Sequence, residues 1–262
     1  MSVEYQAVLT DRREGILTLT LNRPESYNAL NAVVKHELMD ALKNAVRDNS
    51  VRCVVLTGSG TAFSSGQDLK EPALTSATSI SDSVRKEYNP VARLLYTMEK
   101  PVIASINGVA AGAGLSLALA CDLRIMASNA SLRVAFSNIG LAPDCGASFT
   151  LPQLVGRSVA LEMAYTGRAV GADEALRRGL VNQVVTEDSL RQATAELAET
   201  LAARPTRALG LTKHAVNRAL TVDFEEALEY EALTQEIASG TDDFLEGITA
   251  FREKRQPHFE GR

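Results

Sequence analysis

The sequence contains few of the residues that form disulfide bonds or bind metals. Among its 262 residues are three cysteines and three histidines. Cys53, Cys121 and Cys145 are far apart, odd in number and without close pairing, which predicts reduced thiols and excludes a disulfide framework. The histidines stand apart from one another, so the chain offers few ligands for a metal and we expect no metal site.

Long apolar runs and basic tracts are also missing. No run of about 18 apolar residues occurs, which is the length that a membrane-spanning helix needs. The net charge is −5, and Lys and Arg do not alternate with aromatic residues, which argues against a nucleic-acid surface. Residues 1–10 carry neither the apolar core of a signal peptide nor the basic pattern of a transit peptide. We therefore expect a cytoplasmic protein with no nucleic-acid or membrane partner.

What is present is an alternation of short apolar runs and helical patterns, which is typical of an α/β fold. The runs predict strands at 16–21, 51–57, 102–106 and 123–127. The helical patterns cover 31–47, 84–98 and 115–120, and either Asn28 or Asn31 can cap the first of these helices. Residues 71–83 are rich in Ser, Thr, Pro and Ala without periodicity, so we expect a mobile surface segment there.

From about residue 158 the strand patterns largely stop. Helical patterns cover 159–165, 172–178, 189–203, 207–219, 224–237 and 243–255. The dipeptide Arg204-Pro205 forms a natural break, since the residue before a proline disfavours helix. We therefore divide the chain into a core at 1–200 and a helical C-terminal region at 201–262.

Two glycine-containing loops, at 63–69 and 107–115, can aim backbone N–H groups at a ligand. The second loop runs into an apolar helix, and a helix N-terminus favours negative charge, so an oxyanion can be stabilised there. A dinucleotide-binding fingerprint is excluded because Leu117 stands where the third glycine belongs. A serine-hydrolase elbow is excluded because Ala118 replaces its final glycine. Tight packing of the helix against a strand explains the small residues equally well.

One carboxylate stands at a tight turn among apolar neighbours. Asp144 follows Pro143 within LAPDCGA at 141–147, and desolvation there would raise its pKa and suit it to carry a proton near neutral pH. The alternative is that Asp144 only orders its own turn. Cys145 beside it is better explained as a small buried thiol than as a nucleophile.

Several motifs, in order along nearly the whole chain, resemble the crotonase superfamily, which is the enoyl-CoA hydratase/isomerase family. They are LNRPE at 21–25, NALN at 28–31, FSSGQDL at 63–69, KPVIASING at 100–108, GAG at 112–114, CD at 121–122, GLAP at 140–143 and FREKR at 251–255. The resemblance implies a spiral of ββα units with an acyl-CoA site and a helical C-terminal region that assembles trimers or dimers of trimers. It implies no cofactor, because CoA arrives as part of the substrate.

By the same resemblance, the backbone N–H groups of Gln67 and Ala113 form an oxyanion hole around the thioester carbonyl. The family's hydratases activate water with two glutamates, and Ser116 and Phe136 stand at those positions here. Asp144 stands where the family's isomerases carry a catalytic aspartate. The segments AFS at 135–137 and GLAPDCG at 140–146 are most similar to the ring-1,2-epoxyphenylacetyl-CoA isomerases of aerobic phenylacetate degradation.

The resemblance therefore implies an acyl-CoA isomerase with Asp144 as single acid and base, acting on the ring epoxide, on Δ3-Δ2 enoyl-CoA, or on both. An enoyl-CoA hydratase of broad specificity is an alternative, as is a non-catalytic acyl-CoA-binding subunit. Ser116, Phe136 and Phe149 are the candidate pocket residues. The candidate CoA-binding residues are Arg23, Ser65, Gly66, Asp68, Leu69, Lys70 and Lys254.

Overall fold

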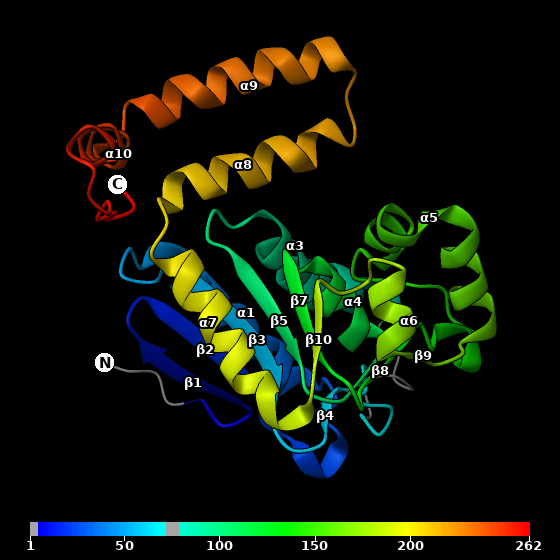
Figure 1. The fold of residues 1–262 in the computed structure, drawn as a ribbon. Helices are drawn as coiled ribbons and strands as arrows, with labels where there is room; N and C mark the ends of the chain where they lie inside the picture. The colour runs from blue at the N-terminus through cyan, green and yellow to red at the C-terminus, as the bar shows by residue number, and fades with distance from the viewer. Residues whose placement is uncertain (1–4, 72–78) are drawn as a thin grey trace.

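Units of two strands and one helical segment recur along the chain (Figure 1). The computed structural model describes residues 5–71 and 79–262. The first unit is β1 (Val8–Arg13), β2 (Ile16–Leu21) and α1 (Ala32–Arg47). The second is β3 (Cys53–Gly58), β4 (Ala62–Ser64), α2 (Ile80–Ser83), the π-helical turn η3 (Val84–Tyr88) and α3 (Asn89–Thr97). The third is β5 (Val102–Ile106), β6 (Val109–Ala111) and α4 (Ala113–Ala120). The fourth is β7 (Leu123–Ala127), β8 (Ser131–Arg133) and α5 (Ala147–Thr166), with the 3-10 helix η4 (Phe136–Ile139) between β8 and α5.

The strands form two mixed sheets. A six-stranded sheet has the order β1-β2-β3-β5-β7-β10, where β10 is Gln183–Val185, and only β1 and β2 pair antiparallel in it. A four-stranded sheet has the order β4-β6-β8-β9, where β9 is Val170–Gly171 and pairs antiparallel with β8. In the second to fourth units the first strand therefore joins the large sheet and the second strand joins the small one. This arrangement confirms the predicted spiral of ββα units.

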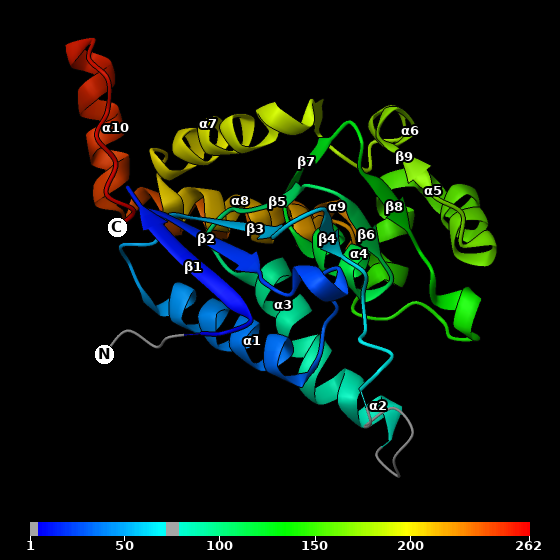
Figure 2. The ribbon, with the colours of Figure 1, turned by 90° about the horizontal axis from the view of Figure 1, so that it is seen from below.

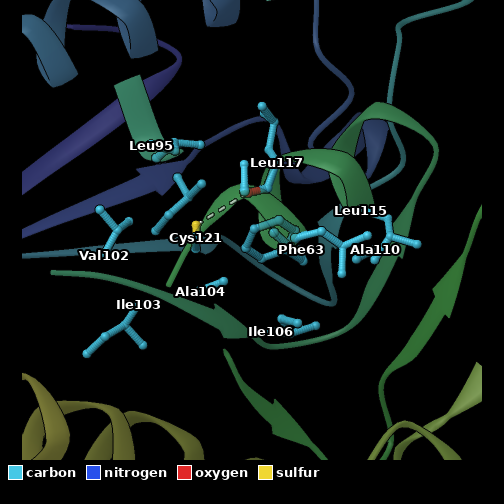
Figure 3. Packing of buried hydrophobic residues seen from close by; sticks show 14 of the residues in the cluster. Phe63, Leu95, Val102, Ile103, Ala104, Ile106, Ala110, Leu115, Leu117 and Cys121 are labelled. Atoms are coloured by element: carbon cyan, nitrogen blue, oxygen red, sulfur yellow. Dashed lines mark hydrogen bonds between the residues drawn. The ribbon is translucent and has the colours of Figure 1, made fainter. Parts of the chain in front are cut away.

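The hydrophobic core lies on both faces of the large sheet. Helices α1 and α3 cover one face, and α7 (Leu190–Ala202) covers the other (Figure 2). Strand β5 is buried along its whole length, as expected for a parallel strand covered on both faces. Figure 3 shows part of this core, in which Phe63 of β4, Leu95 of α3 and Leu117 of α4 belong to one cluster of buried apolar side chains.

Three helices, α8 (Thr206–Ala219), α9 (Phe224–Ser239) and α10 (Asp242–Glu253), make up the C-terminal region. Pro205 immediately precedes α8, where the sequence predicted a break. Helices α9 and α10 extend away from the two sheets (Figure 1). Their exposed apolar side chains include Phe224, Leu245 and Phe251. That this region mediates assembly stays a prediction.

Within residues 5–71 and 79–262, no helix combines the length and apolar character needed to cross a bilayer.

Some elements differ from the sequence-based expectation. Strand β1 was not predicted, because only Val8 in it is buried and the other side chains are polar or exposed. Helix α5 begins at Ala147 instead of near 159, and Gly156, with a φ of 75°, interrupts it and hides its periodicity. Asn31, not Asn28, caps α1 by accepting a hydrogen bond from the Val34 N–H at 3.0 Å. Of the expected mobile segment 71–83, residues 72–78 lie outside the described residues, and 80–83 form α2.

Candidate active site

The loop after β4 touches the start of α4. Gly66 has a φ of +89°, and a Cβ atom built on it would lie 2.8 Å from the Ala111 carbonyl oxygen and 3.2 Å from the Ala113 nitrogen. Both the left-handed backbone and the close approach require glycine at this position. At Gly66 the two loops therefore meet through backbone atoms.

The peptide group between Gly66 and Gln67 has a defined orientation. Its carbonyl oxygen accepts a hydrogen bond from the Leu30 N–H at 2.7 Å, and the Asp68 N–H donates to the Leu30 oxygen at 3.2 Å. Because a trans peptide directs its N–H opposite to its carbonyl, the Gln67 N–H faces away from Leu30. Within the described part of the chain, this N–H has no hydrogen-bond acceptor.

The Ala113 N–H is also available. Ala113 is the first residue of α4, and the first N–H groups of a helix have no partner within it. No other described residue accepts a hydrogen bond from this group. The helix N-terminus adds a partial positive charge, so the Gln67 and Ala113 donors form a place where an anionic oxygen can bind.

Asp144 lies on the turn before α5. Its carboxyl is half-buried, and its Oδ1 atom is fully buried without a hydrogen-bond partner in the described residues. Burial raises the pKa of Asp144, and its contact with the Cys145 thiol offsets part of this rise. Cys145 is buried and takes a left-handed backbone with a φ of 52°. A desolvated carboxyl with an unused oxygen is suited to accept a proton.

A cavity of about 360 Å³ brings these groups together. Gln67, Ala113 and Asp144 line it along with Phe136, which the sequence predicted as a pocket residue. The wall is largely apolar, and α2, η3 and η4 contribute part of it. The arrangement places two backbone N–H donors and one partly buried carboxyl around a largely apolar space, which are features expected of an active site.

Two predicted pocket residues do not line this cavity. Ser116 is buried within α4, where its hydroxyl donates to the Gly112 oxygen at 3.2 Å. Phe149 is 42% exposed on α5 and packs edge-on against Tyr96, with the ring centroids 6.0 Å apart. Helix α4 directs the Ser116 side chain into the protein interior, and α5 directs Phe149 towards Tyr96 at the surface. Neither orientation could be read from the sequence.

The candidate CoA-binding residues are divided between the cavity and the surface. Ser65 and Leu69 line the cavity. The Arg23 guanidinium lies 2.8 Å from the Asp68 carboxylate, and this contact lowers the pKa of Asp68. Lys70 is exposed.

Lys254 lies apart from these residues. It ends α10 with a φ of 55°, and the exposed residue does not line the cavity. The loop 65–70 thus lines the cavity through Ser65, Gln67 and Leu69, whereas Lys254 does not.

The cavity residues that the sequence analysis missed include four titratable ones, Lys35, Glu71, Glu87 and Tyr88. Lys35 is only 5% exposed, and its Nζ lies 2.5 Å from a Glu87 oxygen and 3.6 Å from a Glu71 oxygen. The sequence could have indicated Lys35, because this charged residue occupies a position in the buried apolar stripe that Leu38 and Leu42 continue along α1. Glu71 and Glu87 offer no comparable signal, since neither falls in a recognisable pattern.

Comparison with known proteins relates the chain to one family. Residues 11–262 match the family described as enoyl-CoA hydratase/isomerase. The chain is 41% identical to the 1,2-epoxyphenylacetyl-CoA isomerase of Escherichia coli K12, with 97% of this chain and 98% of that protein covered. It is also 41% identical to a probable enoyl-CoA hydratase of Rhodobacter capsulatus, with 99% of this chain and 100% of that protein covered.

Solved structures show the same fold. An enoyl-CoA hydratase from Bacillus anthracis superimposes with a TM-score of 0.94 at 36% identity, covering 98% of this chain and all of the other. The fold of this chain thus coincides with that of a solved enoyl-CoA hydratase over nearly the full length. The chain belongs to the enoyl-CoA hydratase/isomerase family and is a crotonase-fold enzyme that acts on acyl-CoA thioesters.

Proposed function

We propose that this enzyme is an acyl-CoA isomerase that moves a proton between two carbons of a bound acyl thioester, with Asp144 as the single acid and base. The observation that carries this proposal is the buried Oδ1 atom of Asp144, which lacks a hydrogen-bond partner in a cavity that Gln67 and Ala113 also line. The Asp144 carboxyl lines the cavity and no described residue competes for this oxygen, so the group is suited to exchange a proton with a substrate bound there.

The two backbone N–H donors polarise the thioester carbonyl of the substrate. The thioester carbonyl oxygen accepts hydrogen bonds from the N–H groups of Gln67 and Ala113. Removal of a proton from carbon places negative charge on that oxygen, so the donors bind the enolate more strongly than the substrate. A donor of this kind contributes about 3 kcal/mol to the stability of the transition state.

Asp144 supplies the proton transfer. As carboxylate it takes a proton from one carbon of the acyl group, and the electron pair of that C–H bond moves into the enolate. The carboxylic acid then returns the proton to another carbon, while the enolate charge moves back into a double bond. No atom is gained or lost, which is the balance of an isomerisation.

The other carboxylates of the cavity are already engaged. Glu71 accepts hydrogen bonds from the Ala32 N–H at 2.7 Å and from Gln67 Nε2 at 2.9 Å. Burial raises the pKa of Glu87, but its contacts with Lys35 and Ser83 outweigh burial and lower it. Both groups are therefore poorly suited to deprotonate water, which favours an isomerase with one carboxylate.

The proposed reactions are conversion of 1,2-epoxyphenylacetyl-CoA to its oxepin and migration of a double bond from Δ3 to Δ2. The relative in Escherichia coli that carries the first activity in its name supports that choice. The buried side chain of Phe136 and the largely apolar cavity suit a cyclic or aromatic acyl group. Phenylacetate catabolism is the proposed context, with fatty acid metabolism as the wider one.

Hydration remains the second candidate, because the hydratase relative from Rhodobacter is equally identical and two glutamates line the cavity. A paired assay separates the two functions. The enzyme and Asp144→Ala are incubated with 3-enoyl-CoA and with 2-enoyl-CoA, and double-bond migration and water addition are measured separately. Migration that depends on Asp144, with little hydration, supports the isomerase; rapid hydration that survives the substitution contradicts it.

We further propose that the enzyme assembles as a homotrimer or a dimer of trimers through the C-terminal region. The exposed Phe224, Leu245 and Phe251 support this, because apolar side chains of this size are rarely left in water in such number. The proposed contacts of the CoA phosphates are Arg23, Lys70, Lys254 and Arg255, and residues 66–69 are proposed to lie near the adenine. A cytoplasmic location is proposed for the assembled enzyme.

A further inference from the structure

The side chain of Gln67 is held at both ends. Its Nε2 atom donates to a Glu71 carboxylate oxygen at 2.9 Å and to the Asp68 carbonyl oxygen at 3.1 Å. Its Oε1 atom accepts a hydrogen bond from the Tyr88 hydroxyl. A carboxamide bonded through both its donor and its acceptor has little freedom to rotate.

Glu71 is itself anchored to the N-terminus of α1. One of its oxygens accepts from the Ala32 N–H at 2.7 Å, and the other lies 3.6 Å from Lys35 Nζ. Both Glu71 oxygens are therefore in use, one by the helix and the other by Gln67 and Lys35. Movement of Glu71 would break these contacts together, so the residue is a firm support for Gln67.

Tyr88 is a stable donor at the other end. The residue is 4% exposed, and burial raises the pKa of its phenol, so the hydroxyl keeps its proton at neutral pH. Lys35 Nζ lies 4.8 Å from the centroid of the Tyr88 ring, a cation–π contact that holds the ring in place. Tyr88 belongs to η3, which is also part of the cavity wall.

From these contacts we infer that Glu71 and Tyr88 are positioning residues for the oxyanion donor at Gln67. Leu30 holds the Gly66–Gln67 peptide from its carbonyl side, and the two side chains hold it through the Gln67 carboxamide. Gly66 has no side chain to restrict rotation of this peptide, so the restraint has to come from outside it. The inference rests on the proposed function, because it assigns a purpose to the Gln67 N–H.

The direct test is the carbonyl stretching frequency of bound butanoyl-CoA, isotopically labelled at the carbonyl carbon and measured by difference infrared spectroscopy. This saturated thioester undergoes no double-bond migration, so the readout is independent of turnover. Hydrogen bonds to the carbonyl lower its frequency. We expect Tyr88→Phe and Glu71→Ala to lose part of the shift that the unmodified enzyme produces, with a smaller loss for Glu71→Gln, which keeps one acceptor oxygen.

Turnover of 3-enoyl-CoA provides the second readout. Misplacing one of two donors affects the transition state more than the bound substrate, so we expect kcat to fall about tenfold in Tyr88→Phe while KM changes less than about twofold. Lys86→Ala is the matched control, because Lys86 lies on η3 as Tyr88 does, but it is exposed and its Nζ pairs with Asp82 instead of contacting Gln67. It should leave the carbonyl frequency at its original value.

The outcomes separate this inference from the proposed function. A carbonyl shift in the unmodified enzyme that persists fully in Tyr88→Phe and Glu71→Ala overturns the inference, whatever happens to kcat. No carbonyl shift in the unmodified enzyme overturns the oxyanion hole itself. Asp144→Ala should keep the full shift while losing turnover, since it removes only the proton carrier.

Discussion

Gly66 and Ala113 come so close that a Cβ atom on Gly66 would lie 3.2 Å from the Ala113 nitrogen. The two residues are 47 positions apart in the chain: Gly66 lies in the loop after β4, and Ala113 begins α4 shortly after β6. The parallel pairing of β4 with β6 brings the loops to the same edge of the small sheet. The site therefore depends on the register of two strands of three residues each.

Gly66→Ala should damage both stability and activity. The left-handed φ of +89° and the approach of 2.8 Å to the Ala111 oxygen leave no place for a methyl group. We expect a loss of about 1–3 kcal/mol in the free energy of unfolding, measured by urea denaturation. We also expect a loss of activity of about 100-fold, because the Gln67 donor moves with the loop.

Gly171→Ala is the control for this substitution. A Cβ atom there would meet nothing within 4 Å, and Gly171 has an ordinary φ of −77°. Normal activity and stability are expected. Equal losses in both variants would show that the close approach at Gly66 is unimportant.

The raised pKa of Asp144 links stability to pH. A buried carboxyl binds its proton more tightly in the folded state than in the unfolded chain, so its contribution to stability is greatest below its unfolded value of 3.8 and is lost as pH rises through the higher folded value. Ionised Asp144 thus destabilises the fold at neutral pH. We expect Asp144→Asn to raise Tm at pH 7, with the difference shrinking as the pH falls towards 3.8.

Thermal denaturation over a series of pH values measures this effect. The exposed Asp188 offers a control, because Asp188→Asn changes the same charge without burial. The measured quantity is the Tm of Asp144→Asn minus that of the unmodified enzyme. A smaller value of this difference at pH 7 than at low pH would contradict the prediction. It would mean that the carboxylate is stabilised by contacts in the fold.

Assembly should depend on α10. Phe251 is 85% exposed and Leu245 is 62% exposed, which is unfavourable for side chains of their size in an isolated chain. Phe251→Glu combined with Leu245→Glu should convert the proposed trimer or hexamer to smaller species, as measured by light scattering coupled to size-exclusion chromatography. Exposed Lys86 gives a control in Lys86→Glu, which should leave the mass unchanged. A monomeric unmodified enzyme would contradict the proposal.

The sequence predicted the parts of the fold that have regular patterns. The strands at 102–106 and 123–127 coincide with β5 and β7, because buried parallel strands form continuous apolar runs. The short strands β4, β6 and β8 were not predicted. Each has three residues, which is too short for a period to show, and tertiary packing determines them.

The candidate site was predictable where it depends on local backbone, and not where it depends on long-range contacts. Gly66 and Asp144 stand in turns whose chemistry is evident from neighbouring residues. The contacts of Gln67 with Glu71 and Tyr88 join residues that no pattern relates, since Tyr88 follows Gln67 by 21 positions across another helix. The positioning role that we propose for Glu71 and Tyr88 could therefore be inferred only from their contacts in the folded chain.

The measurement that most directly tests the central claim is double-bond migration of 3-enoyl-CoA by the enzyme and by Asp144→Ala, with binding of the same thioester measured in parallel. Removing a general acid and base should lower kcat about 10²- to 10⁴-fold while affinity is retained. That result would establish Asp144 as the proton carrier of an isomerase. Migration at the original rate in Asp144→Ala would contradict the account, because the cavity would then have to contain another group that carries the proton.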